Sequence, residues 1–228
     1  MFGKALFKMR RAAALGAAGL GACAVLAACG PVQAGAAAIV GDQRITVSSL
    51  DTQVSNLQTA AKPYSGLPLT TAQMPRAVLS WLIRFAVMDQ VADSNGISVT
   101  QAQAQAGLSS LSSLASQNGF SSTSQLLIAN GLPPQLFQDI GRWDAQQTAY
   151  GLKVNGGKEP ASTDEQNTVN TAITKAQCTA AKSLNIQVSP QFGRLDYTQF
   201  SVVPAADTLS KPAGTPTPAS TEGLTPAC

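Results

Sequence analysis

Histidine is absent from the chain, and its absence removes several kinds of chemistry. Histidine is the commonest general base and metal ligand, and the Ser-His and Cys-His nucleophile arrangements both require it. Glycines occur singly or as Asn-Gly-Gly, without the pattern of a phosphate-binding loop. We therefore expect no catalytic residue, no metal ligand and no cofactor, and we predict that the protein is not an enzyme.

Charged residues are also scarce, at 12% of the 228 residues, and aromatic residues make up 5%. The net charge of +3 depends on four basic residues near the N-terminus (Lys4, Lys8, Arg10 and Arg11), without which the 12 acidic residues are in slight excess. Lysine and arginine form no cluster and no stripe interleaved with aromatics. We therefore expect no binding of nucleic acid.

The first 28 residues have the layout of an export signal. The positively charged segment "MFGKALFKMRR" is followed by "AAALGAAGLGACAVLAA", which is uncharged and consists mostly of small residues. This run is short and weakly apolar for a stable membrane span, which needs about 20 strongly apolar residues. We predict a cleaved signal peptide over residues 1–28.

Leu26, Ala27, Ala28 and Cys29, followed by the small Gly30, resemble the lipobox of bacterial lipoproteins. The resemblance implies cleavage between Ala28 and Cys29. It also implies a diacylglyceryl thioether on Cys29, with fatty acids such as palmitate, that anchors the chain at the extracytoplasmic face of the cell membrane. The alternative is an uncleaved signal anchor that ends in an ordinary cysteine.

Residues 29–36, "CGPVQAGA", are expected to form a flexible tether. Of the four cysteines, Cys23 leaves with the signal and Cys29 carries lipid, so that Cys178 and Cys228 remain. Two thiols in an exported protein suggest a disulfide between them. The alternatives are two reduced thiols or oxidation between molecules.

Residues 204–228 are rich in Pro, Thr and Ala and are expected to be an unstructured tail.

Apolar periodicity between these ends predicts a mainly α fold. Leu50, Val54 and Leu57 form one stripe of a helix capped by Thr46 or Ser48. The next helix, within residues 74–94, is apolar nearly all round and is expected to be buried among the others. Its only polar stripe consists of Arg76, Ser80 and Arg84. We expect five helices before residue 153, a sixth within residues 164–185, and strand character in "IQVSPQFGRLDYTQFSVVP".

The order of these segments resembles the core domain of the SurA and PrsA type of extracytoplasmic folding factors. The resemblance rests on "AAIVGDQRITVSSLDTQVSNL", "LIRFAVMDQVADSNGISVT", "SQNGFSSTSQLLIANGLPPQLFQDIGRWD" and "VSPQFGRLD", in which Ser189 and Gln191 depart from the family pattern. It implies an orthogonal core of about six helices over residues 37–203, with a small β element that pairs the N- and C-terminal segments.

Full members of that family carry a parvulin prolyl isomerase where this chain offers only "NGGKEPAST", and parvulin sites use histidines. The resemblance therefore implies a non-catalytic chaperone that binds unfolded or newly exported polypeptides. The alternative function is a scaffold lipoprotein that binds one envelope protein.

The residues that bind the client are not specified by the sequence. Large side chains at helical spacing (Met74, Trp81, Phe85, Met88 and Trp143) are interpreted as core rather than as a client-binding surface. Asp89 and Asp93 are interpreted as a solvated helix end.

Overall fold

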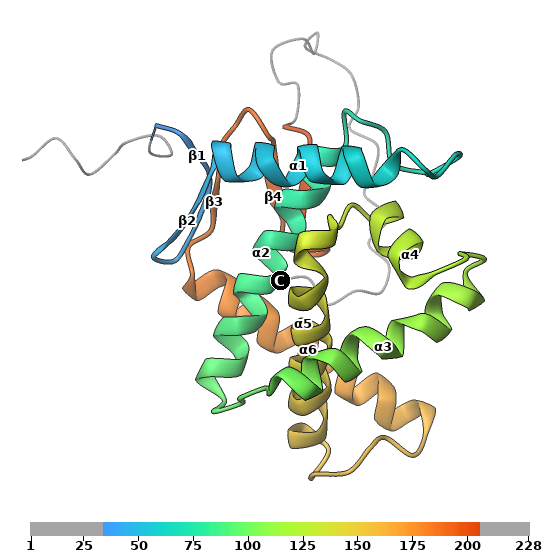
Figure 1. Ribbon diagram of the computed structural model, residues 1–228. Coiled ribbons are helices and arrows are strands. Elements are labelled where there is room, and N and C mark those ends of the chain that lie inside the picture. The colour runs from blue at the N-terminus through green and yellow to red at the C-terminus, as the bar shows by residue number, and fades with distance from the viewer. Residues whose placement is uncertain (1–33, 206–228) are drawn as a thin grey trace, which may run out of the picture. The chain divides into compact units, whose positions relative to one another are not determined.

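The computed structural model describes residues 34–205, all of which fall within one compact unit. Within this range the chain forms six α-helices, one short 3-10 helix and five short strands (Figure 1). They are β1 (Ala36–Val40), β2 (Gln43–Thr46), α1 (Val47–Ala61), α2 (Met74–Ser94), α3 (Gln101–Gln117), α4 (Thr123–Ala129), η1 (Pro134–Leu136), α5 (Phe137–Val154), α6 (Thr163–Ser183), β3 (Gln187–Val188), β4 (Arg194–Asp196) and β5 (Ser201–Val203). The prediction of a mainly α fold is confirmed.

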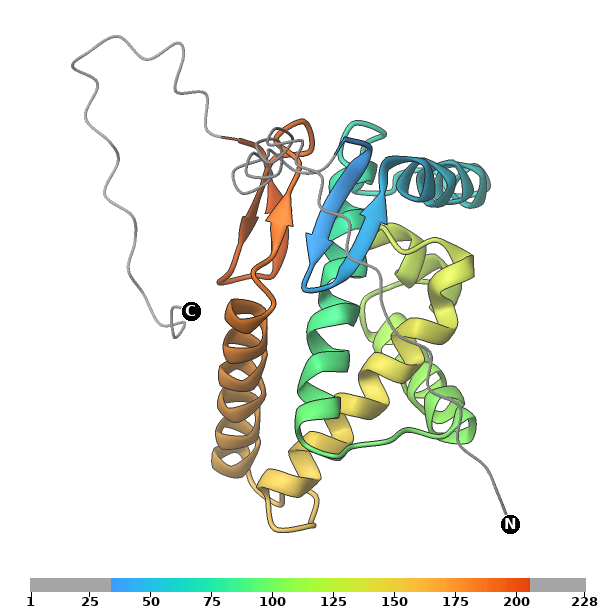
Figure 2. The same cartoon turned by 90° about the vertical axis from the view of Figure 1, so that its left-hand side faces the viewer.

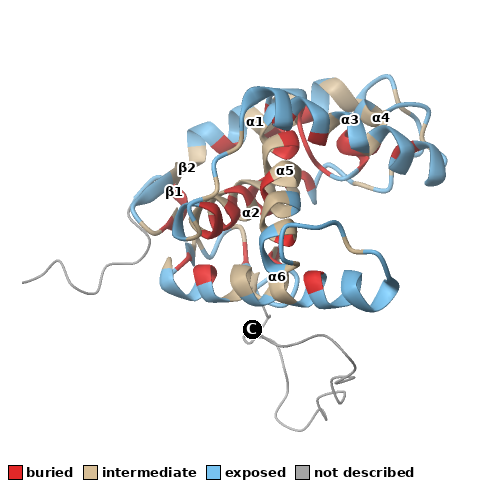
Figure 3. Ribbon diagram, turned by 90° about the horizontal axis from the view of Figure 1, so that it is seen from below, coloured by how far each residue is buried: buried red, intermediate tan, exposed pale blue. Residues whose placement is uncertain are grey.

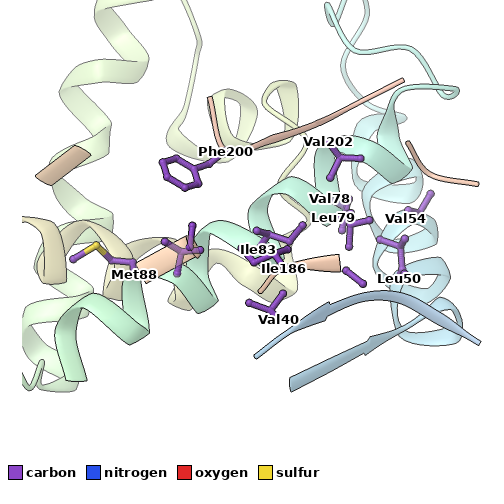
Figure 4. Packing of buried hydrophobic residues seen from close by; sticks show 14 of the residues in the cluster. Val40, Leu50, Val54, Val78, Leu79, Ile83, Met88, Ile186, Phe200 and Val202 are labelled. Carbon is purple, nitrogen blue, oxygen red and sulfur yellow. The ribbon is translucent and has the colours of Figure 1, made fainter. Parts of the chain in front are cut away.

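Helix α2 lies at the centre of the main hydrophobic core. Its side chains are buried on several sides, as the nearly continuous apolar sequence predicts. Val78, Leu79 and Ile83 are fully buried, and they pack with residues of α1 and β1 and with Val202 of β5 (Figure 4). Helix α1 lies across the upper end of α2, and α3 lies across α5 (Figure 1). Crossings of this kind give the orthogonal core that the sequence implies.

Polar residues at the helix starts explain where these helices begin. Thr46 caps α1 by accepting a hydrogen bond from the backbone N–H of Ser49 at 3.1 Å. At the start of α3, Thr100 and Gln103 form a reciprocal capping box. These caps satisfy backbone N–H groups that have no partner inside the helix. The expected cap at Thr46 is confirmed, and Ser48 lies inside α1.

Segments from both ends of the described chain meet in one small sheet, with strand order β2-β1-β3. Strand β1 pairs with the neighbouring β2 and also with β3, where Ala38 faces Val188 and Ile39 faces Gln187 (Figure 2). This confirms the predicted β element that joins N- and C-terminal segments. It also fixes the end of α6 beside β1, because Gly41 donates a backbone hydrogen bond to Leu184 at 2.7 Å.

A second β element, the antiparallel hairpin of β4 and β5, packs on α2. The "SPQFG" segment turns the chain between β3 and β4. Gly193 in this turn has φ +125°, and a Cβ there would lie 2.0 Å from the carbonyl oxygen of Val203. Only glycine fits this position without a shift of the backbone.

Two residues of the polar stripe of α2, the buried Ser80 and the partly exposed Arg84, contact this hairpin. The buried Ser80 hydroxyl accepts the N–H of Val202 at 2.8 Å and donates to the carbonyl of Arg76. Arg84 donates to the carbonyls of Phe200 and Gln199 at 3.0 and 2.9 Å. The stripe therefore attaches the C-terminal strands to the central helix.

Helices α3 and α5 approach closely because both carry glycine at the crossing. A Cβ on Gly107 would lie 2.4 Å from the carbonyl oxygen of Gly141, and a Cβ on Gly141 would lie 2.2 Å from that of Ala104. Helix α5 also contacts α6, through Gly151 and Val169.

Figure 3 shows the buried residues concentrated where the helices face one another, with exposed residues along the outer side of α6. None of the helices in residues 34–205 is long and apolar enough to cross a membrane.

Candidate functional site

Three cavities follow one side of α5 and share lining residues. One, of about 430 Å³, lies between α5 and α6, and a second, of about 290 Å³, lies between α3 and α5. Both are lined by Asp144, Thr148 and Leu152. A third, of about 230 Å³, lies between α2, α5, α6 and the β4–β5 turn, and shares Gln147 with the first. We call these three cavities together the α5 groove.

Helical spacing places the floor of the α5 groove on one face of α5. Trp143, Asp144, Gln147, Thr148 and Leu152 follow one another at intervals of one, three, one and four residues, which spreads them over about half of the helix circumference. The walls carry small or neutral side chains from α3 and α6: Gln103, Ala106, Gly107, Ser110, Gln166, Val169, Asn170 and Ile173. Apart from the charged Asp144, Glu159 and Arg84, the lining of the groove is therefore a mixture of small apolar patches and uncharged hydrogen-bonding groups.

Asp144 lies where the first two cavities meet. Its Oδ2 accepts a hydrogen bond from the Ser110 hydroxyl of α3 at 3.2 Å. Partial burial raises the pKa of the Asp144 carboxyl, and the hydrogen bond from Ser110 opposes this shift. The space for this carboxylate depends on Gly107, because a Cβ there would lie 3.2 Å from Oδ2.

The upper end of the groove is built on aromatic residues. The rings of Trp81 and Trp143 meet edge to face with centroids 5.8 Å apart, and the guanidinium of Arg84 lies 4.8 Å from the Trp81 ring centroid. The Trp81 indole N–H donates to the carbonyl of Asn130 at 2.9 Å. That of Trp143 is buried without a hydrogen-bond partner among the described residues. Burial lowers the pKa of the Arg84 guanidinium.

The large side chains considered in the sequence divide between core and groove. Met74, Phe85 and Met88 are buried, so their interpretation as core is confirmed. Trp81 and Trp143 are half-buried and pack on a second hydrophobic cluster, while Trp143 also lines the groove. This cluster consists of Phe85, Leu127, Leu132, Leu136 and Ile140. Asp144, Gln147 and Thr148 were not identified from the sequence as candidate site residues. Their helical spacing was the available signal.

The two acidic residues near the end of α2 differ in their surroundings. Asp93 is exposed, as expected for a solvated helix end. For Asp89 that interpretation is wrong, because it accepts hydrogen bonds from Arg142 at 3.2 Å and from Gln146 at 2.8 Å. Gln146 is buried, so this contact joins α2 to α5 inside the helical packing. In residues 34–205 there is no cluster of three metal-ligating side chains.

The modification sites predicted from the sequence lie mostly beyond the described residues. Ala28, Cys29 and Cys228 fall outside the range 34–205. Cys178 lies on α6, where it is half-buried and packs against the main core. The lipid on Cys29 and the disulfide between Cys178 and Cys228 therefore remain predictions.

Comparison with known proteins identifies the domain. A family model described as the SurA-like N-terminal domain matches residues 10–148, a range that ends within α5. Searches of the curated proteins and of the solved structures gave no match. Since the family model covers more than half of the sequence, the chain belongs to the SurA-like N-terminal domain family.

Proposed function

We propose that the protein is a membrane-anchored extracytoplasmic lipoprotein that binds unfolded or newly exported polypeptides in the α5 groove and acts as a non-catalytic chaperone. The family to which the chain belongs is chaperone-type. The observation that carries the proposal is the groove itself, that is, three neighbouring cavities along α5 that share lining residues.

The dimensions and lining of the groove suit an extended peptide. Trp143 and Leu152 are nine positions apart, about 14 Å along a helix. This equals the length of about four residues of extended chain. Gln147, Thr148 and Asn170 offer hydrogen-bonding groups for a peptide backbone, while Leu152 and Ile173 offer apolar contact. Because backbone contacts do not depend on the client's side chains, such a site accepts many sequences.

The anchor is supported by the sequence of the N-terminus. A lipobox that ends at Cys29 follows a basic and then an apolar segment. Two acyl chains, each contributing about 0.8 kcal/mol per buried CH₂, hold a protein durably on a membrane where a single chain does not. The chaperone would then act on polypeptides close to the membrane surface.

Suppression of aggregation tests the chaperone activity. We expect the purified protein, at severalfold molar excess, to reduce light scattering by a chemically unfolded client. Thr148→Trp, which fills the groove floor, should abolish the effect, whereas Thr59→Trp on the exposed side of α1 should preserve it. Aggregation that proceeds unchanged with the wild-type protein would refute the chaperone activity.

A crosslinking pull-down from membranes separates the chaperone from the alternative scaffold. A chaperone yields many substoichiometric clients, and their recovery falls in the Thr148→Trp variant. A single stoichiometric envelope protein, captured equally by wild type and variant, would favour the scaffold.

A further inference from the structure

The α5 groove carries negative charge without compensating positive charge in its lower part. The two cavities that meet at Asp144 are lined by two carboxylates, Asp144 and Glu159, and by neither lysine nor arginine. Charged residues are rare in this domain: residues 94–138, which include all of α3 and α4, contain no charged residue. Two carboxylates in one pair of cavities are therefore unusual here.

Two basic residues close to the groove in sequence, Arg142 and Lys153, are bound elsewhere, whereas Lys158, next to Glu159, is exposed and forms no ion pair within residues 34–205. Arg142 pairs with Asp89 at 3.2 Å and with Asp139 at 3.5 Å. Lys153 donates to the carbonyl of Asn95 at 2.8 Å, at the end of α2. Within residues 34–205, Asp144 therefore forms no ion pair.

The Asp144 carboxylate has acceptor capacity left for a ligand. The Ser110 hydroxyl lies 3.2 Å from Oδ2 and shares its one proton with the carbonyl of Gly107 at 2.7 Å, and within the described residues no hydrogen bond reaches Oδ1. The half-buried position reduces the screening by water, so that a cation placed there is attracted more strongly than on an open surface. The neighbouring lining is small and apolar, with Ala106, Ala145 and Ala149 on one side.

From this charge complementarity we propose that the α5 groove selects extended client segments in which a lysine or arginine stands among small apolar residues, with the cation against Asp144. The inference rests on the proposed function and specifies its substrate class. Glu159 at the edge of the larger cavity adds to the attraction, and segments that carry an acidic residue at the same position are repelled.

Peptide binding measured by fluorescence anisotropy with the purified full-length protein tests the proposal. Three labelled heptapeptides of alanine and leucine differ only at the central position, which is lysine, norleucine or glutamate. We expect the lysine peptide to bind about fivefold more tightly than the norleucine peptide, as for a partly screened ion pair, and the glutamate peptide to bind most weakly. Asp144→Asn should remove the preference for lysine, and Asp51→Asn, on the exposed face of α1, should preserve it.

The outcomes distinguish this inference from the proposed function. If all three peptides bind equally to the wild-type protein and Thr148→Trp abolishes their binding, the groove binds clients and the charge preference is wrong. A lysine preference that persists in Asp144→Asn would also overturn it. If no peptide binds, both the preference and the groove as client site are wrong.

Discussion

At the scale of single residues, Ser80 connects α2 to the C-terminal hairpin through one hydroxyl group. It accepts from the N–H of Val202 and donates to Arg76. Ser80→Ala leaves a buried N–H without an acceptor, which costs about 1 to 3 kcal/mol of folding free energy. Chemical denaturation should show this loss, and hydrogen exchange at Val202 should accelerate. Ser109→Ala, at an exposed position of α3, should change stability by less than about 0.5 kcal/mol.

The raised pKa of Asp144 predicts that the free energy of unfolding depends on pH in a specific way. Because burial raises its pKa in the folded state, folding favours the protonated carboxyl. Its contribution to stability is therefore most favourable below the unfolded-state pKa of about 3.9 and declines as pH rises through the folded-state pKa.

Asp144→Asn removes this ionisation and keeps an acceptor for Ser110. We expect the variant to be more stable than the wild type at pH 7, with the difference vanishing near pH 3. Denaturation midpoints of the wild type and the variant at pH 7 and pH 3 measure this difference in stability. A wild type that is more stable than the variant at pH 7 would show that the ionised carboxylate stabilises the fold. Asp51→Asn should show no such pH-dependent difference.

At the scale of elements, the crossing of α3 and α5 sets one wall of the groove. Gly141→Ala places a Cβ 2.2 Å from the carbonyl oxygen of Ala104, so α3 must move away from α5. We expect a loss of about 2 to 3 kcal/mol in thermal or chemical unfolding, although alanine favours a helix over glycine by about 1 kcal/mol.

Gly119→Ala is the matched control, because φ +75° strains an alanine there but no atom lies within 4 Å of its Cβ. It should cost less than Gly141→Ala and leave client binding unchanged. A loss in Gly141→Ala that is no larger than that in Gly119→Ala would show that α3 moves away from α5 at little cost, and would contradict the importance of the close crossing.

The elements themselves could be predicted because their signals are local. Leu50, Val54 and Leu57 repeat at helical spacing, and Thr46 stands where a cap is needed. The groove could not be predicted in this way. It depends on which faces of α3, α5 and α6 meet, and Gly107 and Gly141 lie far apart in the sequence. The contact of Ser80 with Val202 spans even more of the chain, so the sequence showed a polar stripe on α2 but not the strand that it contacts.

At the scale of the whole molecule, intact mass and peptide mapping of protein extracted from membranes test the predicted modifications. We expect a diacylated peptide that begins at Cys29, and a Cys178–Cys228 linked peptide that separates on reduction. On the chain-entropy model, closing this loop stabilises the protein by about 4 kcal/mol. An unmodified N-terminus that begins at Met1 would contradict the lipid anchor, and separate cysteine peptides without reductant would contradict the disulfide.

Site-specific photocrosslinking tests the central claim most directly, namely that unfolded polypeptide binds in the α5 groove. A photoreactive side chain is placed at Thr148 on the groove floor, or at Thr59 on the exposed side of α1 as control. The groove position should crosslink an unfolded client strongly and its folded form weakly, and the control position should crosslink neither. Equal crosslinking at both positions, or none at Thr148 while aggregation is still suppressed, would show that clients bind elsewhere.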